Sequence, residues 1–85
     1  MKLLKFYATW CGPCKTLTKT MEGIELPCEV VSIDIAEDMH LATKYKVRSV
    51  PTLILVNEND EPIATKTGSL SKEDIVEMTL SQKSK

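Results

Sequence analysis

The sequence predicts a small α/β domain with the element order β-α-β-α-β-β-α, in which helices flank a four-stranded mixed sheet. Two observations support this fold class. In the first half of the chain, short apolar or β-branched segments alternate with segments of helical spacing. In the second half, a turn-rich pentapeptide separates two apolar segments, and a helix start signal follows them. The 85 residues are enough for one domain, 1–85, with a modest core.

The first half of the chain is predicted to form a strand, a helix, a second strand and a second helix. Residues 3–8 are mostly apolar, which favours a strand buried on both faces. Pro13 suits the first turn of a helix, where its missing N–H costs nothing, and Gly23 is a typical C-terminal cap. The β-branched segment 29–35 predicts the second strand, and a short helix from about Glu37 follows.

The second half is predicted to add an antiparallel hairpin. Its strands, 52–56 and 63–66, are separated by residues 57–61, which are rich in turn formers. A strand–helix–strand start implies that the first two strands pair in parallel. The hairpin therefore makes the sheet a mixed one.

The last helix has a clear start signal. Ser71 and Asp74, three residues apart, resemble a capping box, in which each side chain bonds the backbone N–H of the other residue. The helix should begin at Ser71 or Lys72 and end near Leu80. The polar tail 81–85 is expected to fray.

Composition and charge argue against several classes of partner. The chain has 11 Lys and Arg against 12 Asp and Glu, a formal net charge of −1, so neither nucleic acid nor a membrane is an expected partner. No apolar run approaches the roughly 20 residues of a membrane span. Lys5 interrupts the apolar stretch that most resembles a secretory signal. A reducing compartment, the cytoplasm, is therefore the expected location.

The chemistry of this chain centres on Cys11-Gly12-Pro13-Cys14, a Cys-x-x-Cys pair between a predicted strand and a predicted helix. Two thiols at this spacing can close into a disulfide and reopen, and a helix N-terminus stabilises a thiolate. Cys11, at the leading edge of the helix, is the expected exposed nucleophile. Cys14, one turn further, should face the core as the resolving thiol.

A zinc site is the main alternative for these cysteines. A zinc ribbon needs a second Cys-x-x-Cys, and the remaining soft ligands, Cys28 and His40, stand at an unrelated spacing. We therefore expect no metal and no bound cofactor beyond the disulfide itself. Cys28 is expected to be a small buried or partly exposed thiol, with regulation by oxidation as the alternative. His40 is assigned no role.

A second motif is Val50-Pro51-Thr52, at the start of the third predicted strand. From physics alone a trans bond is favoured, because only about 5–6 % of X–Pro bonds in folded proteins are cis. Together with Trp10-Cys11-Gly12-Pro13-Cys14-Lys15, however, the segment 44–52 closely resembles thioredoxins. The segment 67–72 is similar to a later glycine loop of that family. The resemblance covers residues 3–80.

The resemblance implies a thioredoxin fold with Pro51 in the cis form against the disulfide. It also implies a substrate-binding surface made of Trp10, Gly12, Pro13, Val50, Pro51, Gly68 and Ser69. The implied reaction is attack by Cys11 on a disulfide of a protein substrate, followed by resolution by Cys14.

The resemblance further implies a monomer that receives electrons from NADPH through a thioredoxin reductase. Glutathione is the alternative donor, because the chain is as short as a glutaredoxin. Against it, Gly12-Pro13 replaces the glutaredoxin Pro-Tyr, and Gly68 is not part of a Gly-Gly-x-x-Asp pattern. A redox-inactive binding module is the alternative from another class.

Several positions depart from the thioredoxin pattern. Lys5 replaces the buried aspartate of the family, Ser32 replaces its usual lysine partner, and Lys19 replaces the helix-kinking proline. The late hairpin glycine is missing, and the family's extra strand and helix precede the point that matches Leu3. Lys5 and Lys15 could tune the thiolates electrostatically. Alternatively, the Lys5 stem lies along apolar surface and its ammonium reaches water.

Overall fold

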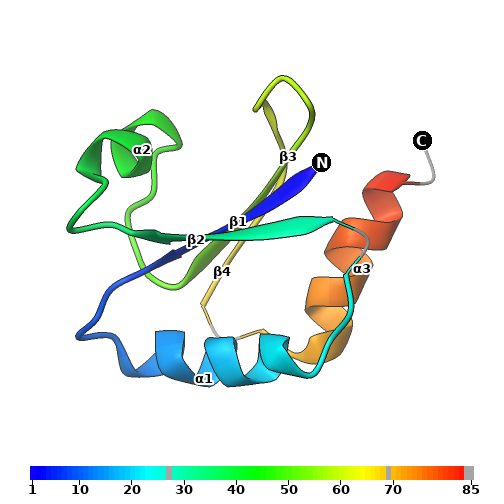
Figure 1. The fold of residues 1–85 in the computed structure, drawn as a ribbon, viewed down its shortest axis with the longest axis horizontal. Coiled ribbons are helices and arrows are strands. Elements are labelled where there is room, and N and C mark those ends of the chain that lie inside the picture. The colour runs from blue at the N-terminus through cyan, green and yellow to red at the C-terminus, as the bar shows by residue number, and fades with distance from the viewer. Residues whose placement is uncertain (27, 69, 84–85) are drawn as a thin grey trace.

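The computed structural model describes residues 1–26, 28–68 and 70–83, and these form the seven predicted elements in the predicted order (Figure 1). The elements are β1 (Lys2–Tyr7), α1 (Gly12–Glu22), β2 (Glu29–Asp34), α2 (Met39–Lys44), β3 (Thr52–Val56), β4 (Pro62–Thr67) and α3 (Lys72–Lys83). The fold class predicted from the sequence is confirmed.

The four strands form one mixed sheet in the order β2-β1-β3-β4. β1 pairs in parallel with β2 and antiparallel with β3, and β3 pairs antiparallel with β4 as the predicted hairpin. The strand β1 therefore lies between β2 and β3, and residues 3–6 are buried. This explains why the strand is almost continuously apolar, with Lys5 as the exception.

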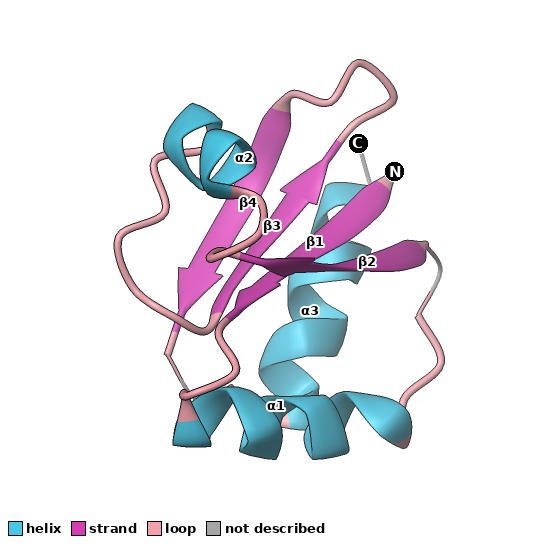
Figure 2. Ribbon diagram, turned by 60° about the vertical axis from the view of Figure 1, so that its left-hand side comes forward, coloured by secondary structure: helices cyan, strands magenta, loops and turns pink. Residues whose placement is uncertain are grey.

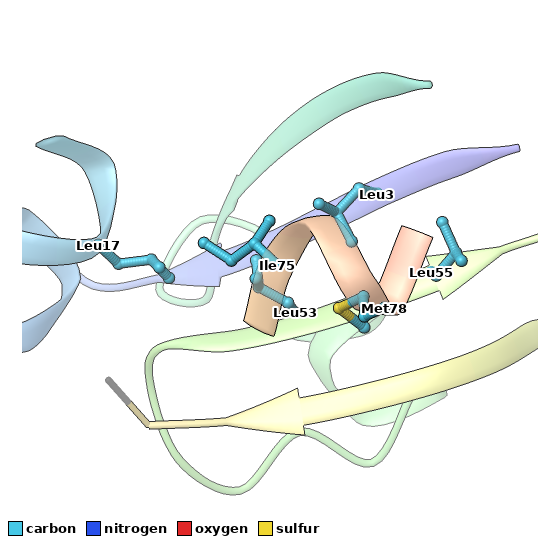
Figure 3. Packing of buried hydrophobic residues seen from close by; sticks show 6 residues of the cluster. All are labelled: Leu3, Leu17, Leu53, Leu55, Ile75 and Met78. Carbon is cyan, nitrogen blue, oxygen red and sulfur yellow. The ribbon is translucent and has the colours of Figure 1, made fainter. Parts of the chain in front are cut away.

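The helices cover both faces of the sheet. α1 and α3 lie on one face and α2 on the other (Figure 2). Successive residues of β1 point to opposite faces, so Leu3 packs beneath α1 and α3 while Leu4 and Phe6 pack toward α2. The larger cluster, shown in Figure 3, consists of Leu3, Leu17, Leu53, Leu55, Ile75 and Met78.

Two helix boundaries differ from the sequence prediction. α2 begins at Met39, two residues after Glu37, because the backbone N–H groups of Glu37 and Asp38 turn back to the carbonyl of Asp34. α3 continues to Lys83, beyond the predicted end near Leu80. Ser84 and Lys85 lie outside the described residues, and fraying of the tail stays a prediction.

The capping box at the start of α3 is confirmed. The Ser71 N–H donates to Asp74 Oδ2 at 3.2 Å, and the Asp74 N–H donates to Ser71 Oγ at 3.2 Å. The backbone N–H of Ser71, with a smaller contribution from its side chain, holds the pKa of Asp74 below its usual value. The two bonds thereby satisfy backbone donors at the start of α3.

Replacing Ser71 by Ala should destabilise the protein by about 1 kcal/mol in urea unfolding at pH 7, because the cap of α3 is lost. A carboxylate with a lowered folded pKa stabilises the fold above its unfolded pKa, and this contribution disappears as pH falls through the folded pKa. Ser71→Ala keeps the backbone N–H that donates to Asp74 and loses only the hydroxyl, so wild type and variant should both lose stability toward about pH 3 while most of the difference between them persists. Ser71→Thr, which retains a hydroxyl, should keep most of the stability. An equal loss for both variants would contradict the capping role.

Candidate active site

The two motif cysteines lie where the buried strand β1 passes into α1. The Cys11 N–H donates to the Ala8 carbonyl at 3.2 Å and closes the turn between these elements. Cys11 occupies the N-cap position, and Pro13 stands in the first turn of the helix, as predicted. Cys11 and Cys14 form a disulfide, with their Cα atoms 5.3 Å apart.

The expected difference in exposure between the cysteines is not found in the disulfide form. Cys11 is 4 % exposed and Cys14 3 %, because both pack with Ala8 and beside Val50. The expectation of an exposed Cys11 is therefore wrong for this state. The two sulfurs differ instead in hydrogen bonding, since the Cys14 N–H donates to Cys11 Sγ at 3.2 Å. This donor and the helix N-terminus would stabilise negative charge on Cys11 after reduction.

The Val50–Pro51 bond is cis, as the family resemblance implies and contrary to the trans geometry favoured by physics alone. Val50 packs against the cluster of Ala8, Cys11 and Cys14, and Pro51 is fully buried. The local sequence cannot report this geometry, because it depends on how the segment is held between the disulfide and β4.

Gly68 joins this loop to the end of β4. Its N–H donates to the Pro51 carbonyl at 3.0 Å. Its φ of +84° lies in the left-handed region, where a side chain is disfavoured, so a glycine is required here. Gly68 thus lies beside the Pro51 loop, and its role in substrate binding stays a prediction; Ser69 lies outside the described residues.

The residues that flank the disulfide are exposed, and one of them, Trp10, has a large apolar side chain. Trp10 is 74 % exposed, and its neighbours Gly12 and Pro13 are also exposed. On the flank of α1, a groove of about 440 Å³ is lined by residues that include Cys14, the exposed Lys15 and Lys19. Lys15 is therefore near the pair, as expected, on the side of the resolving cysteine.

Lys5 is largely buried, and its ammonium is bound by a hydroxyl on α1. It is 8 % exposed, and its Nζ donates to Thr18 Oγ1 at 3.0 Å. Nζ also lies 5.9 Å from the centre of the Tyr7 ring. Burial lowers the pKa of Lys5, and the nearby Glu22 carboxylate opposes that effect. Ser32 stands opposite Lys5 in the β1–β2 register, as expected.

Sequence reasoning missed Thr18. Its hydroxyl accepts from Lys5 and donates to the Cys14 carbonyl at 3.0 Å. The available signal was its position four residues after Cys14, on the same face of α1, where threonine commonly bonds back to the preceding turn. Thr18 therefore links the strand lysine to the backbone of the resolving cysteine.

The zinc alternative finds no cluster to support it in the described part of the chain. Among those residues, no three His, Cys, Asp or Glu side chains gather so as to hold a metal ion. Cys28 is half-buried beside the α1–α3 core and His40 is exposed on α2. No helix within the described ranges is both long and apolar enough to cross a membrane.

A disulfide at a helix N-terminus, beside a cis proline and an exposed tryptophan, defines a dithiol–disulfide exchange site on an α/β fold. Comparison with known proteins agrees. The thioredoxin family model matches residues 1–81. A thioredoxin of Staphylococcus epidermidis is 35 % identical over 82 residues, covering 92 % of this chain and 78 % of that protein.

Solved structures are similar too. A mutant thioredoxin from Halobacterium salinarum superposes with a TM-score of 0.80 at 36 % identity, covering 92 % of this chain and 74 % of the other. The germline-specific Drosophila thioredoxin Deadhead gives 0.78 at 31 % identity, covering 94 % and 78 %. The chain belongs to the thioredoxin family and is a thiol–disulfide oxidoreductase of that family.

Burial of Lys5 should give the protein a distinct alkaline stability profile. A lysine with a lowered folded pKa costs stability while it is charged in both states, and the cost is relieved as pH rises through the folded pKa toward the unfolded value. Relative to wild type, Lys5→Met should therefore gain most near pH 7, by about 1 kcal/mol. The gain should shrink toward about pH 10.

Urea unfolding of the disulfide form at several pH values would test this. Lys2→Met, on the same strand at an exposed position, is the matched control and should follow wild type at every pH. A difference between Lys5→Met and wild type that stays constant from pH 7 to 10 would contradict the prediction.

Proposed function

We propose that this protein carries electrons from an NADPH-dependent thioredoxin reductase to disulfides in other proteins, as a monomer in the reducing cytoplasm. The observation that supports it most is the Cys11–Cys14 disulfide at the start of α1, next to the cis Val50–Pro51 bond. Membership of the thioredoxin family supports the same donor and substrates. No bound cofactor is required, since the disulfide itself holds the electron pair.

The reaction begins with the reduced pair. The Cys11 thiolate attacks one sulfur of the substrate disulfide, the other substrate sulfur leaves, and a mixed disulfide forms. Cys14 then loses its proton to solvent and attacks Cys11 Sγ, which releases the second substrate sulfur and closes Cys11–Cys14. Two electrons pass to the substrate, and the reductase returns the pair to the dithiol state.

Substrate would bind over the exposed edge of the disulfide. The proposed surface consists of Trp10, Gly12, Pro13, Val50, Pro51, Gly68 and Ser69. Its support comes from the exposed aromatic ring of Trp10 and from the Gly68–Pro51 hydrogen bond beside the cysteine cluster. A large exposed aromatic side chain next to a reactive centre is typical of a protein-binding surface.

The electron donor can be tested directly. Turnover of a protein disulfide would be followed with NADPH and thioredoxin reductase, and separately with NADPH, glutathione and glutathione reductase. We expect faster turnover with thioredoxin reductase. Turnover with glutathione alone would replace the proposed donor and leave the exchange chemistry intact.

The roles of the two cysteines are separable by mutation. Cys14→Ser should accumulate a mixed disulfide with substrate, because the nucleophile remains and the resolving thiol is gone. Cys11→Ser should form none through the pair and should lose turnover. Mass spectrometry of the trapped species measures both outcomes, with Cys28→Ser as the control that should retain turnover. Wild-type activity in a variant with both motif cysteines replaced would instead favour the binding module.

Trp10→Ala should weaken substrate use without loss of stability. We expect roughly a tenfold fall in kcat/KM for a protein disulfide, because an exposed aromatic contact is removed. Met39→Ala is the matched control, since Met39 is 69 % exposed at the start of α2, on the other face of the sheet. Equal effects of both changes would argue against a substrate surface at Trp10.

A further inference from the structure

One buried charge lies beneath the active-site helix. Lys5 comes from the middle of β1, on the face covered by α1, and its ammonium donates to the Thr18 hydroxyl. That hydroxyl donates in turn to the carbonyl oxygen of Cys14. Two hydrogen bonds of 3.0 Å each therefore tie the only buried lysine among the described residues to the backbone of the resolving cysteine.

This charge acts differently on the two redox states. The disulfide is neutral, whereas the dithiol form carries negative charge whenever one of its thiols ionises. A fixed positive charge close by stabilises a thiolate and leaves the energy of the disulfide almost unchanged. Low exposure of Lys5 to water makes its field stronger than that of a solvated surface lysine such as Lys15.

We propose that Lys5, held in place by Thr18, stabilises the thiolate form of the Cys11–Cys14 pair and so makes this protein a weaker reductant than the same chain without that charge. The inference deepens the proposed function and rests on it only in that the pair cycles between dithiol and disulfide. Lys5 is a positioning and tuning residue, because it reaches the cysteines through Thr18 and through space.

The groups around Lys5 bear on the sign of the effect. The carboxylate of Glu22, in the last turn of α1, is near enough to raise the pKa of Lys5, although burial acts more strongly in the other direction. Glu22 therefore partly offsets the positive field. Tyr7 offers the face of its ring to the ammonium, a contact that favours a cation. We assign the ammonium as the form present at neutral pH.

Lys5 neither gains nor loses a proton in the redox step. When the pair reduces a substrate disulfide, the Cys14 S–H bond breaks and its proton passes to water. The electron pair of the thiolate forms the Cys14–Cys11 bond, while the bond between Cys11 and the substrate sulfur breaks. Lys5 remains charged throughout and lowers only the energy of the species that carry a thiolate.

The test is the equilibrium of the pair with dithiothreitol buffers of defined dithiol-to-disulfide ratio at pH 7. Alkylation and mass counting separate the pair from Cys28, which adds one constant label. The midpoint is the dithiol-to-disulfide ratio of dithiothreitol at which half of the pair is reduced. In Lys5→Met this ratio should rise threefold to tenfold, because the disulfide form is favoured. A tenfold change corresponds to about 30 mV for a two-electron couple. Lys5→Arg, which keeps the charge, should stay within about twofold of wild type. The control Lys2→Met should do the same.

A second pair of variants tests the proposal without changing Lys5. Thr18→Val removes the hydroxyl that holds the ammonium and should shift the midpoint in the same direction, by less. Glu22→Gln removes the opposing carboxylate and should shift it the other way, toward the dithiol. Changes of opposite sign at two neighbouring sites are not expected from altered packing alone.

Three results would overturn the proposal. The first is a midpoint for Lys5→Met within twofold of Lys2→Met. The second is an equal shift for Lys5→Arg, which would show that packing and not charge is responsible. The third is a wild-type midpoint in Lys5→Met together with slower exchange with a substrate disulfide, which would mean that Lys5 acts as a neutral base. None of these touches the proposed function, which fails only if wild-type protein does not turn over protein disulfides.

Discussion

The active site depends on one structural constraint, the junction between the central, mostly buried strand β1 and the helix that starts at the first cysteine. β1 is held between β2 and β3 and packs on both faces, so its C-terminal end has little freedom. The Cys11 N–H bonds back to Ala8, and Cys14 donates to Cys11 Sγ. The sulfur atom is thus a helix cap and a nucleophile at the same position, which couples the redox state to the first turn of α1.

The other half of the site comes from the second half of the chain, and the sheet brings it to the cysteines. β3 lies beside β1, so the residues before it arrive at the same edge as the cysteines. Val50 contacts the cysteine cluster, and the Gly68 N–H fixes the Pro51 carbonyl from the end of β4. Two loops separated widely in the sequence become one surface because their strands are neighbours. Removal of either strand pairing would separate the disulfide from the proline loop.

The sequence predicted the seven elements, the parallel start, the hairpin and the capping box, since each has a local signal in residue type or spacing. The cysteine motif also placed the redox centre correctly. Local patterns could not predict the features that depend on tertiary contacts. These are the cis geometry at Pro51, the burial of Cys11 and the hydrogen-bond partner of the Lys5 ammonium. A lysine in a strand has the same local signature whether its head reaches water or a threonine on a neighbouring helix.

Lys5 also changes how the resolving cysteine can lose its proton. The thioredoxin pattern has a carboxylate at this position, which accepts hydrogen bonds and can accept a proton, whereas a lysine ammonium only donates. In this chain the ammonium donates to Thr18, whose hydroxyl donates to Cys14. The Cys14 thiol therefore cannot transfer its proton directly to the side chain at position 5. In our proposal, that side chain instead stabilises the thiolate electrostatically. The groove beside Cys14, which is also lined by Lys15 and Lys19, opens to solvent, so water that enters it would accept the proton. The substitution thus replaces a group that can accept a proton with a fixed positive charge, and both lie beneath the same cysteine pair.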